Sequence, residues 1–337
     1  MHSNFRRHAA LSLLTLVGLS CRGLPSRPAP QSEFWFLPAP DEPPARFAID
    51  TASRRTNGQT VRVLIDSISL RPLVLDPPRE RSASSENEQR LPTVAVVTSY
   101  QGDRYHPETV RALGEDSDVR GRMAAAITRL AGIRSKGPLV IDFQGMTADD
   151  LPIVMEVSRA IADSARKNAW GPIGFIVPAA DTLTYPHATL GRIADLIVVR
   201  LTDEHRPGTP PGPLASPDWL SRQLAVRITR LGAGRVVAEL PVFGYRWERG
   251  GSARIISFAA ARSAVAAEAG AFRRDDVSGF LTASSARDGW EIWIADATTI
   301  RQLVARARTA GVTKFALAGI ESADPAILDL VGASAIR

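Results

Sequence analysis

Short apolar runs alternate with segments of amphipathic helical spacing along most of the chain. The runs are rich in Val, Ile and Leu, which is typical of parallel strands buried on both faces. Eight of them lie at residues 34–37, 61–70, 93–98, 139–141, 173–177, 194–201, 235–242 and 313–317. Strands that alternate with helices predict parallel βα units. We therefore expect the α/β fold class, with a single (β/α)8 TIM barrel.

Helical spacing between the runs predicts helices at residues 110–133, 153–167, 220–231 and 300–310. Two long polar stretches are predicted surface loops: the Ser-rich residues 77–90 and the Pro/Gly-rich residues 203–219. The Gly-Ala-Gly stretch at 232–234 is typical of a helix C-cap and turn rather than of a phosphate-binding loop.

The first 21 residues have the layout of a secretory signal peptide. A basic start precedes an apolar core at residues 9–19, which is too short to span a bilayer. The segment ends in small residues and in Cys21, the single cysteine of the chain. Cys21 resembles the lipidated cysteine of bacterial lipoproteins, although Gly18 stands where Leu is usual. Plain secretion, with Cys21 incidental, is the alternative.

The chain is then predicted to divide into a signal peptide at 1–21, a Pro-rich tether at 22–32 and a barrel domain at 33–337. The protein is expected to be exported, as a periplasmic, outer-membrane or cell-surface lipoprotein. Its contact with the membrane would be through the lipid anchor only. Without a disulfide, the domain must be stabilised by its core alone.

Charge and motif content exclude several classes of function. The net charge is +6, but the chain has only three lysines and its arginines are spread out, so no basic patch predicts nucleic-acid binding. No nucleophile elbow, Walker A loop or dinucleotide fingerprint occurs, and no cofactor is expected. His106, His187 and His205 lack the spacing of metal ligands, so no metal site is expected.

The fourth apolar run carries the strongest chemical signal. Residues 139–141 lead directly into Asp142, Phe143 and Gln144, at the strand end where α/β barrels place their chemistry. This stretch resembles the fourth strand of glycoside hydrolase family 18, the chitinase-like barrels, whose motif ends in D-x-D-x-E. Asp142 stands at the middle carboxylate, and Gln144 stands in place of the final Glu.

Four further stretches carry the same resemblance, which extends from residue 33 to about 331 and is closest to bacterial envelope and spore-wall modules. They are residues 200–205, similar to M-x-Y-D-x-H; the P-G-P-L-A-S-P-D-W loop ending at Trp219, similar to G-P-x-A-S-x-x-W; residues 240–247, similar to L-P-x-Y-G-Y-D-W; and residues 290–297, similar to x-x-V-W-F-x-D-A. Each match is weak alone, but five occur in the family's order.

The resemblance also implies that the active site is degenerate. In the family, the Glu protonates the glycosidic oxygen and the sugar's own 2-acetamido group attacks the anomeric carbon. The preceding Asp and a sixth-strand Tyr orient the acetamide, and an eighth-strand Trp floors the sugar pocket. Here these positions hold Gln144, Asp142, Thr202 and Ala318. General-acid catalysis commonly contributes ~10²- to 10⁴-fold, and an amide cannot supply it.

Asp142 and Gln144 therefore mark the catalytic position, where both could bond a sugar. As structural alternatives, Asp142 bonds a neighbouring strand or loop, and Gln144 is an isosteric remnant. Asp203 and Glu204 are adjacent, so in a continuing strand they face opposite sides, and one could serve as a relocated acid.

The remaining candidates for substrate binding lie near these residues in the motifs. Thr202 and Glu204 fall in the sixth-strand segment, which contacts substrate in the family. Tyr245 and Trp247 follow the seventh strand, where aromatic rings stack on sugars or pack the barrel rim.

Three hypotheses of function follow. The leading one is a non-catalytic envelope protein, a pseudoenzyme, that binds N-acetylglucosamine-containing glycan (chitooligosaccharide or peptidoglycan) or an envelope protein. The second is an active glycosidase on such glycans, with Asp203 or Glu204 as its acid. The third is a structural envelope scaffold without a sugar site.

Overall fold

The computed structural model describes residues 33–37, 61–71, 74–75, 93–101, 104–131 and 137–334. The chain forms two units, 1–30 and 31–337, and all described residues lie in the second. The predicted signal peptide with Cys21, the tether and the predicted loop 77–90 lie outside the described residues. Among the helices that are described, none combines the length and the apolar character needed to cross a membrane.

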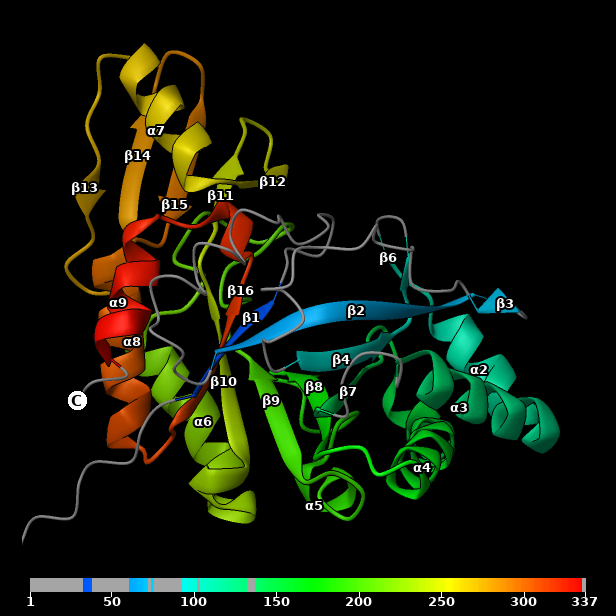
Figure 1. The fold of residues 1–337 in the computed structure, drawn as a ribbon. Helices are drawn as coiled ribbons and strands as arrows, with labels where there is room; N and C mark the ends of the chain where they lie inside the picture. The colour runs from blue at the N-terminus through cyan, green and yellow to red at the C-terminus, as the bar shows by residue number, and fades with distance from the viewer. Residues whose placement is uncertain are drawn as a thin grey trace, which may run out of the picture. The chain divides into compact units, whose positions relative to one another are not determined.

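Eight parallel strands of the described chain close into a barrel (Figure 1). In order along the chain they are β1 (Glu33–Leu37), β2 (Val61–Arg71), β4 (Thr93–Thr98), β7 (Leu139–Asp142), β8 (Ile173–Pro178), β9 (Leu196–Arg200), β10 (Val236–Pro241) and β16 (Lys314–Ala318). Because β1 pairs with both β16 and β2, the sheet has no open edge at this point. The short β3 (Val74–Leu75) extends β2 as an antiparallel partner. The predicted (β/α)8 barrel is confirmed.

From β4 onward, the described helices alternate with the barrel strands and pack on the outside of the barrel. They are α2 (Pro107–Glu115), α3 (Ser117–Ala131), α4 (Leu151–Lys167), α5 (His187–Leu190), α6 (Pro217–Leu231), α8 (Ala297–Thr309) and α9 (Ala326–Ser334), with 3-10 turns at Ala148–Asp150, Ala233–Arg235 and Ile320–Ser322. After α6, Gly232 adopts a positive φ of 80°, as predicted for a helix end.

The helix predicted at 110–133 is in fact two helices, α2 and α3. Asp116 lies between them with an extended backbone. Its Oδ1 accepts hydrogen bonds from the backbone N–H of Asp118 (2.8 Å) and of Val119 (2.9 Å), the first turn of α3. An Asp that caps a new helix N-terminus in this way ends the preceding helix, and the apolar spacing alone did not reveal it.

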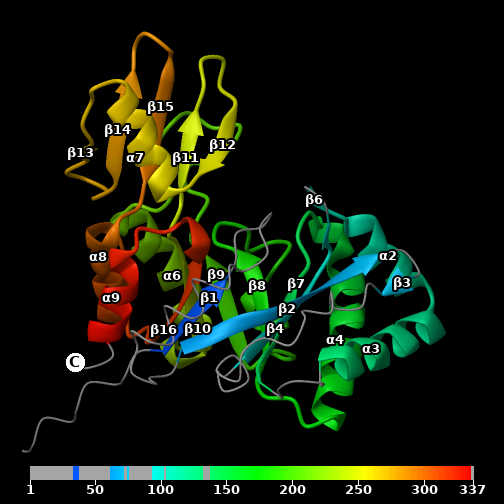
Figure 2. The ribbon, with the colours of Figure 1, turned by 45° about the horizontal axis from the view of Figure 1, so that its top comes forward.

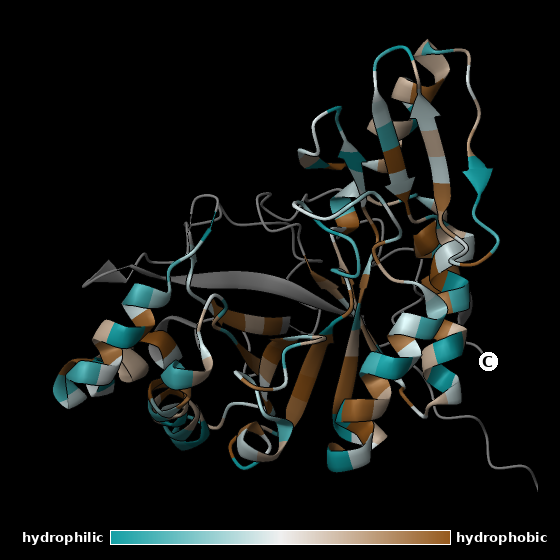
Figure 3. Cartoon of the chain, turned by 180° about the vertical axis from the view of Figure 1, so that it is seen from behind, coloured by the Kyte–Doolittle hydropathy of each residue, from teal (hydrophilic) through white to brown (hydrophobic). Residues whose placement is uncertain are grey.

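The period-two alternation of the strands divides the core into two layers. Alternate residues such as Val140, Val198 and Val237 belong to the cluster inside the barrel. Their neighbours, among them Ile141, pack outward against the helices. Figure 3 shows the strands as largely hydrophobic, whereas the helices expose polar faces. The same alternation directs Asp142, two residues beyond Val140, to the inside of the barrel.

A second sheet is inserted between β10 and α8, and the sequence analysis did not predict it. It contains β11 (Gly244–Trp247), β12 (Ala253–Ile256), β13 (Arg273–Arg274), β14 (Leu281–Ser285) and β15 (Trp290–Ile294), antiparallel in the order β12-β11-β15-β14-β13 (Figure 2). Helix α7 (Phe258–Ala267) packs on it through Ala261 and Val265. These strands are short and mix apolar with polar residues, as in L-T-A-S-S of β14 and W-E-I-W-I of β15, so they lack the apolar runs of the barrel.

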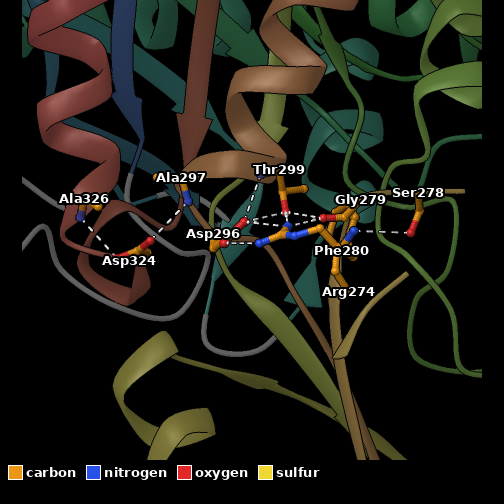
Figure 4. A network of polar contacts seen from close by, with 9 residues as sticks. All are labelled: Arg274, Ser278, Gly279, Phe280, Asp296, Ala297, Thr299, Asp324 and Ala326. Carbon is orange, nitrogen blue, oxygen red and sulfur yellow. Dashed lines mark hydrogen bonds and ion pairs between the residues drawn. The ribbon is translucent and has the colours of Figure 1, made fainter. Parts of the chain in front are cut away.

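A polar network joins the inserted sheet to α8 (Figure 4). Asp296 is the N-cap of α8: its Oδ1 accepts from the backbone N–H of Thr299 (2.9 Å) and from the Thr299 hydroxyl (2.8 Å). Arg274 of β13 donates to both carboxylate oxygens of Asp296, at 3.1 and 2.6 Å. Asp324 accepts from Ala297 N–H on the same helix end (3.1 Å).

We predict that Asp296→Ala lowers the free energy of unfolding by about 1–3 kcal/mol, because the variant loses a helix cap and a charge-assisted bond. Urea denaturation at neutral pH measures the change. Asp163→Ala is the matched control: Asp163 is exposed and lies 3.9 Å from Arg166, so this change should stay within about 0.5 kcal/mol. Equal effects of the two substitutions would contradict the structural role of Asp296.

Candidate functional site

Polar side chains gather at the carboxyl ends of β7, β9 and β10. Asp142 is the last residue of β7, Arg200 is the last of β9, and Glu239 lies opposite Arg200 in the β9–β10 register. Tyr105 belongs to β6 (Arg104–Tyr105), a short strand that pairs with β5 (Tyr100–Gln101) after β4. Residues distant in sequence therefore meet at one end of the barrel.

Asp142 lies at the centre of this cluster and is only 6% exposed. Its Oδ1 accepts from Gln144 Nε2 at 2.8 Å. Its Oδ2 accepts from the Tyr105 hydroxyl at 2.9 Å and from Arg200 Nη2 at 3.1 Å. Both carboxylate oxygens are thus occupied by donors of the protein itself.

Arg200 links two carboxylates and a tyrosine. Besides its bond to Asp142, its Nε donates to Glu239 Oε1 (3.1 Å) and its Nη1 donates to the Tyr105 hydroxyl (3.0 Å). Burial works to lower the pKa of Arg200, but Asp142, Tyr105 and Glu239 outweigh it and raise the pKa well above its usual value. Arg200 stays a cation and supplies the counter-charge of the cluster.

Gln144 is also buried, with 6% exposed. Its Nε2 donates to Asp142 Oδ1 and to the backbone carbonyl of Ile176 in β8, at 3.0 Å. The carboxylate and the carbonyl are both hydrogen-bond acceptors only. The group of Gln144 that faces them must therefore be the amide nitrogen and not the amide oxygen. An amide held by two acceptors does not transfer a proton to a leaving group.

Two further carboxyl groups each have an oxygen without a hydrogen-bond partner among the described residues. One is Glu239, which is 3% exposed and whose Oε2 has no such partner. The other is the half-buried Asp203, whose Oδ1 has none. Burial raises the pKa of Glu239, and Arg200 offsets part of this effect. Burial likewise raises the pKa of Asp203, whereas the nearby charges of Arg200 and Arg206 lower it.

Glu239 was not predicted from the sequence. The one sign of it there is an acidic residue within the buried run V-V-A-E-L-P.

Glu204 and Asp203 are adjacent in sequence, but their side chains have different surroundings. Glu204 Oε1 accepts from the Ser216 hydroxyl at 2.8 Å, and Oε2 accepts from the Ser216 backbone N–H. Ser216 is the N-cap of α6 and accepts from Trp219 N–H. Glu204 therefore fastens the Pro/Gly-rich loop to α6. Thr202, at the position of the family's Tyr, is buried, and Ala318 ends β16.

The two aromatic candidates differ in their surroundings. Trp247 is 2% exposed and its Nε1 donates to the carbonyl of Thr209 at 3.1 Å, so the ring packs against the loop instead of stacking on a ligand. Tyr245 is half-buried, with edge-to-face contacts to Phe243 and Trp247 at centroid distances of 5.6 and 5.5 Å. No cluster of metal-ligating side chains occurs within the described ranges.

We expect Arg200→Met to lower the free energy of unfolding by roughly 3–5 kcal/mol, because Asp142 and Glu239 would remain buried without their counter-ion. The double variant Arg200→Met/Glu239→Gln should regain part of the loss. Chemical denaturation provides the measurement, with Arg254→Met as the control, since Arg254 is exposed and forms only a surface ion pair.

The loss of unfolding free energy caused by Arg200→Met should also depend on pH. Arg200 offsets part of the rise that burial causes in the pKa of Glu239, so without Arg200 the folded-state pKa of Glu239 lies further above that of the unfolded chain. The favourable contribution of Glu239 is then present at low pH and is lost as pH rises through the folded pKa. The difference between variant and parent should therefore be larger at pH 8 than at pH 5; a difference that does not change with pH would contradict the charge argument.

No protein-family model matches the chain. Two glycosylases of Bacillus subtilis (strain 168) are similar in sequence. YvbX, an uncharacterized glycosylase, is 22% identical over 214 residues, which are 60% of this chain and 57% of YvbX. YdhD, which its name describes as a sporulation-specific glycosylase, is 22% identical over 166 residues, 48% of this chain and 39% of YdhD. The chain thus matches less than two thirds of either relative.

Solved structures align over most of the chain. The spore cortex-lytic enzyme SleL of Bacillus cereus has a TM-score of 0.76 at 14% identity, with 90% of this chain and 74% of SleL covered. The chitinase of Chromobacterium violaceum ATCC 12472 has a TM-score of 0.74 at 17% identity, with 91% and 99% covered. In fold, the chain is therefore similar to this spore cortex-lytic enzyme and to this chitinase.

Proposed function

We propose that the protein is an exported, non-hydrolysing barrel that binds N-acetylglucosamine-containing glycan at the carboxyl ends of its strands. The observation that carries the proposal is the state of the catalytic position. Gln144 stands where the family has its acid, and its amide nitrogen is tied to Asp142 and to Ile176. The site therefore lacks the proton donor at this position but keeps the fold of glycan-active proteins.

The environment of Asp142 supports the same proposal. In the family this Asp orients the substrate acetamide, which requires a free carboxylate oxygen. Here Tyr105 and Arg200 share one oxygen and Gln144 occupies the other. Protein donors thus use three of the roughly four lone-pair sites of this carboxylate, which leaves about one for a ligand. Such a constraint is compatible with binding nearby and disfavours the acetamide-assisted reaction.

The proposed location is the bacterial envelope, with the lipid anchor at Cys21 and the tether at 22–32 holding the barrel near a membrane. The support is the order of a basic start, an apolar core and a single cysteine in the first 21 residues. An envelope glycan such as peptidoglycan would be within reach of a domain held in this way.

A second candidate function is an active glycosidase with Asp203 as a relocated acid. The observation in its favour is that Asp203 is half-buried, has a raised pKa and keeps a buried Oδ1 without a described partner. A carboxyl with these properties suits a general acid. Glu204 is the weaker choice, because both of its oxygens are engaged by Ser216.

The decisive experiment titrates the purified protein calorimetrically with chitotetraose and with a muropeptide mixture, and analyses the same samples for products. We expect heat of binding and no cleavage. Cleavage that is lost in Asp203→Asn would establish the glycosidase instead. Absence of any binding would reject both and favour the scaffold hypothesis.

Substitution of the two aromatic residues should separate binding from packing. Trp247→Ala should cost about 3–5 kcal/mol of stability, because a buried indole is removed. Tyr245→Ala should weaken glycan binding with a smaller loss of stability, because that ring is only half-buried. Unfolding and titration of both variants test this, and a Trp247→Ala protein as stable as its parent would contradict the packing role.

A further inference from the structure

Three carboxyl groups interact with Arg200 at this end of the barrel. Arg200 bonds Asp142 and Glu239, and its charge also acts on Asp203. Arg206, the other arginine that acts on Asp203, lies on the exposed loop. This cluster at the carboxyl ends of the barrel strands is thus acidic, although the protein as a whole carries a net charge of +6.

The hydrogen bonds of this cluster are unevenly distributed. Asp142 uses both of its oxygens, whereas Glu239 binds Arg200 through Oε1 and leaves Oε2 without a described partner. The Glu239 side chain is only 4% exposed, and a buried acceptor without a donor is costly. Asp203 has a second such oxygen, and its charge acts on Glu239. Each of these two carboxyl groups therefore has one buried oxygen without a donor among the described residues.

The groups that would recognise an acetamide are replaced in the same region. Thr202 stands at the position of the Tyr that orients the acetamide, and Ala318 stands at the position of the Trp that floors the pocket. Asp142 already accepts three hydrogen bonds from protein donors. What the centre offers instead is negative charge with free acceptors.

From these contacts we propose that the sugar unit at the barrel centre carries a free 2-amino group, as in glucosamine within partly de-N-acetylated glycan, and that Glu239 and Asp203 bind its ammonium. This inference rests on the proposed glycan-binding function and specifies its ligand.

The chemistry of the two amino sugars favours this assignment. An ammonium has three N–H donors and a positive charge, so it can satisfy two carboxylates at once. An acetamide is neutral, has a single N–H, and brings a carbonyl oxygen that would face the same carboxylates. Glu239 Oε2 can accept a hydrogen bond from the ammonium while Oε1 keeps its hydrogen bond from Arg200.

The experiment compares tetramers of glucosamine and of N-acetylglucosamine, titrated calorimetrically into the full protein near neutral pH. We expect the glucosamine tetramer to bind at least ~10-fold more tightly, the scale of one charge-assisted hydrogen bond. Glu239→Gln and Asp203→Asn should each reduce this preference, and added salt should weaken it because the attraction is ionic. Glu156→Gln, on the exposed face of α4, should leave the preference unchanged.

The outcomes separate the two proposals. Equal or tighter binding of the acetylated tetramer would overturn the amino-group inference and leave the glycan-binding function standing. Binding of neither tetramer would reject the glycan-binding function, and the inference with it. If Glu239→Gln fails to fold, as unfolding curves would show, the ligand comparison on the parent protein and the Asp203→Asn variant still decide the question.

Discussion

The inner end of this barrel depends on the ion pairs that Arg200 forms with Asp142 and Glu239. Charges inside a barrel are unfavourable unless each is paired and hydrogen-bonded. Arg200 meets this requirement for two carboxylates from different strands, and it also bonds Tyr105 from the β5–β6 hairpin. The arginine therefore joins β7, β9, β10 and that hairpin at the carboxyl ends of the barrel strands.

This constraint changes the meaning of the motif at the end of β7. Asp142, the carboxylate of this motif, serves as an internal ion-pair partner of Arg200. Strand alternation explains the arrangement: residues 140 and 142 both face inward, and so do 198 and 200, so the apolar filling of the barrel is followed directly by its polar centre.

The barrel itself was well predicted from sequence, because its strands are apolar runs with bounds that a linear pattern reveals. The centre was predicted only in part. Asp142 and Gln144 were found through a motif, but Glu239 was missed, and Arg200 was noted only as a motif position. Arg200 and Glu239 lie on separate strands, and they meet only because β9 and β10 are paired in the register that places one opposite the other. The inserted sheet was missed because its half-exposed strands carry no comparable run, and the break at Asp116 depends on a single capping side chain.

The Pro/Gly-rich loop after β9 is fastened at several points: Glu204 binds Ser216, His205 Nδ1 lies 3.0 Å from the Pro210 carbonyl, and Thr209 accepts from Trp247. A loop with so many internal bonds loses little conformational entropy when a ligand arrives. The backbone on either side of Asp203, at the start of this loop, is held in the same way by the bonds from Leu201 N–H to the Glu239 carbonyl and from Glu204 N–H to the Leu214 carbonyl. Recognition at this end of the barrel would be by a preorganised surface, and its selectivity would come from the fixed positions of charges rather than from closure of a lid.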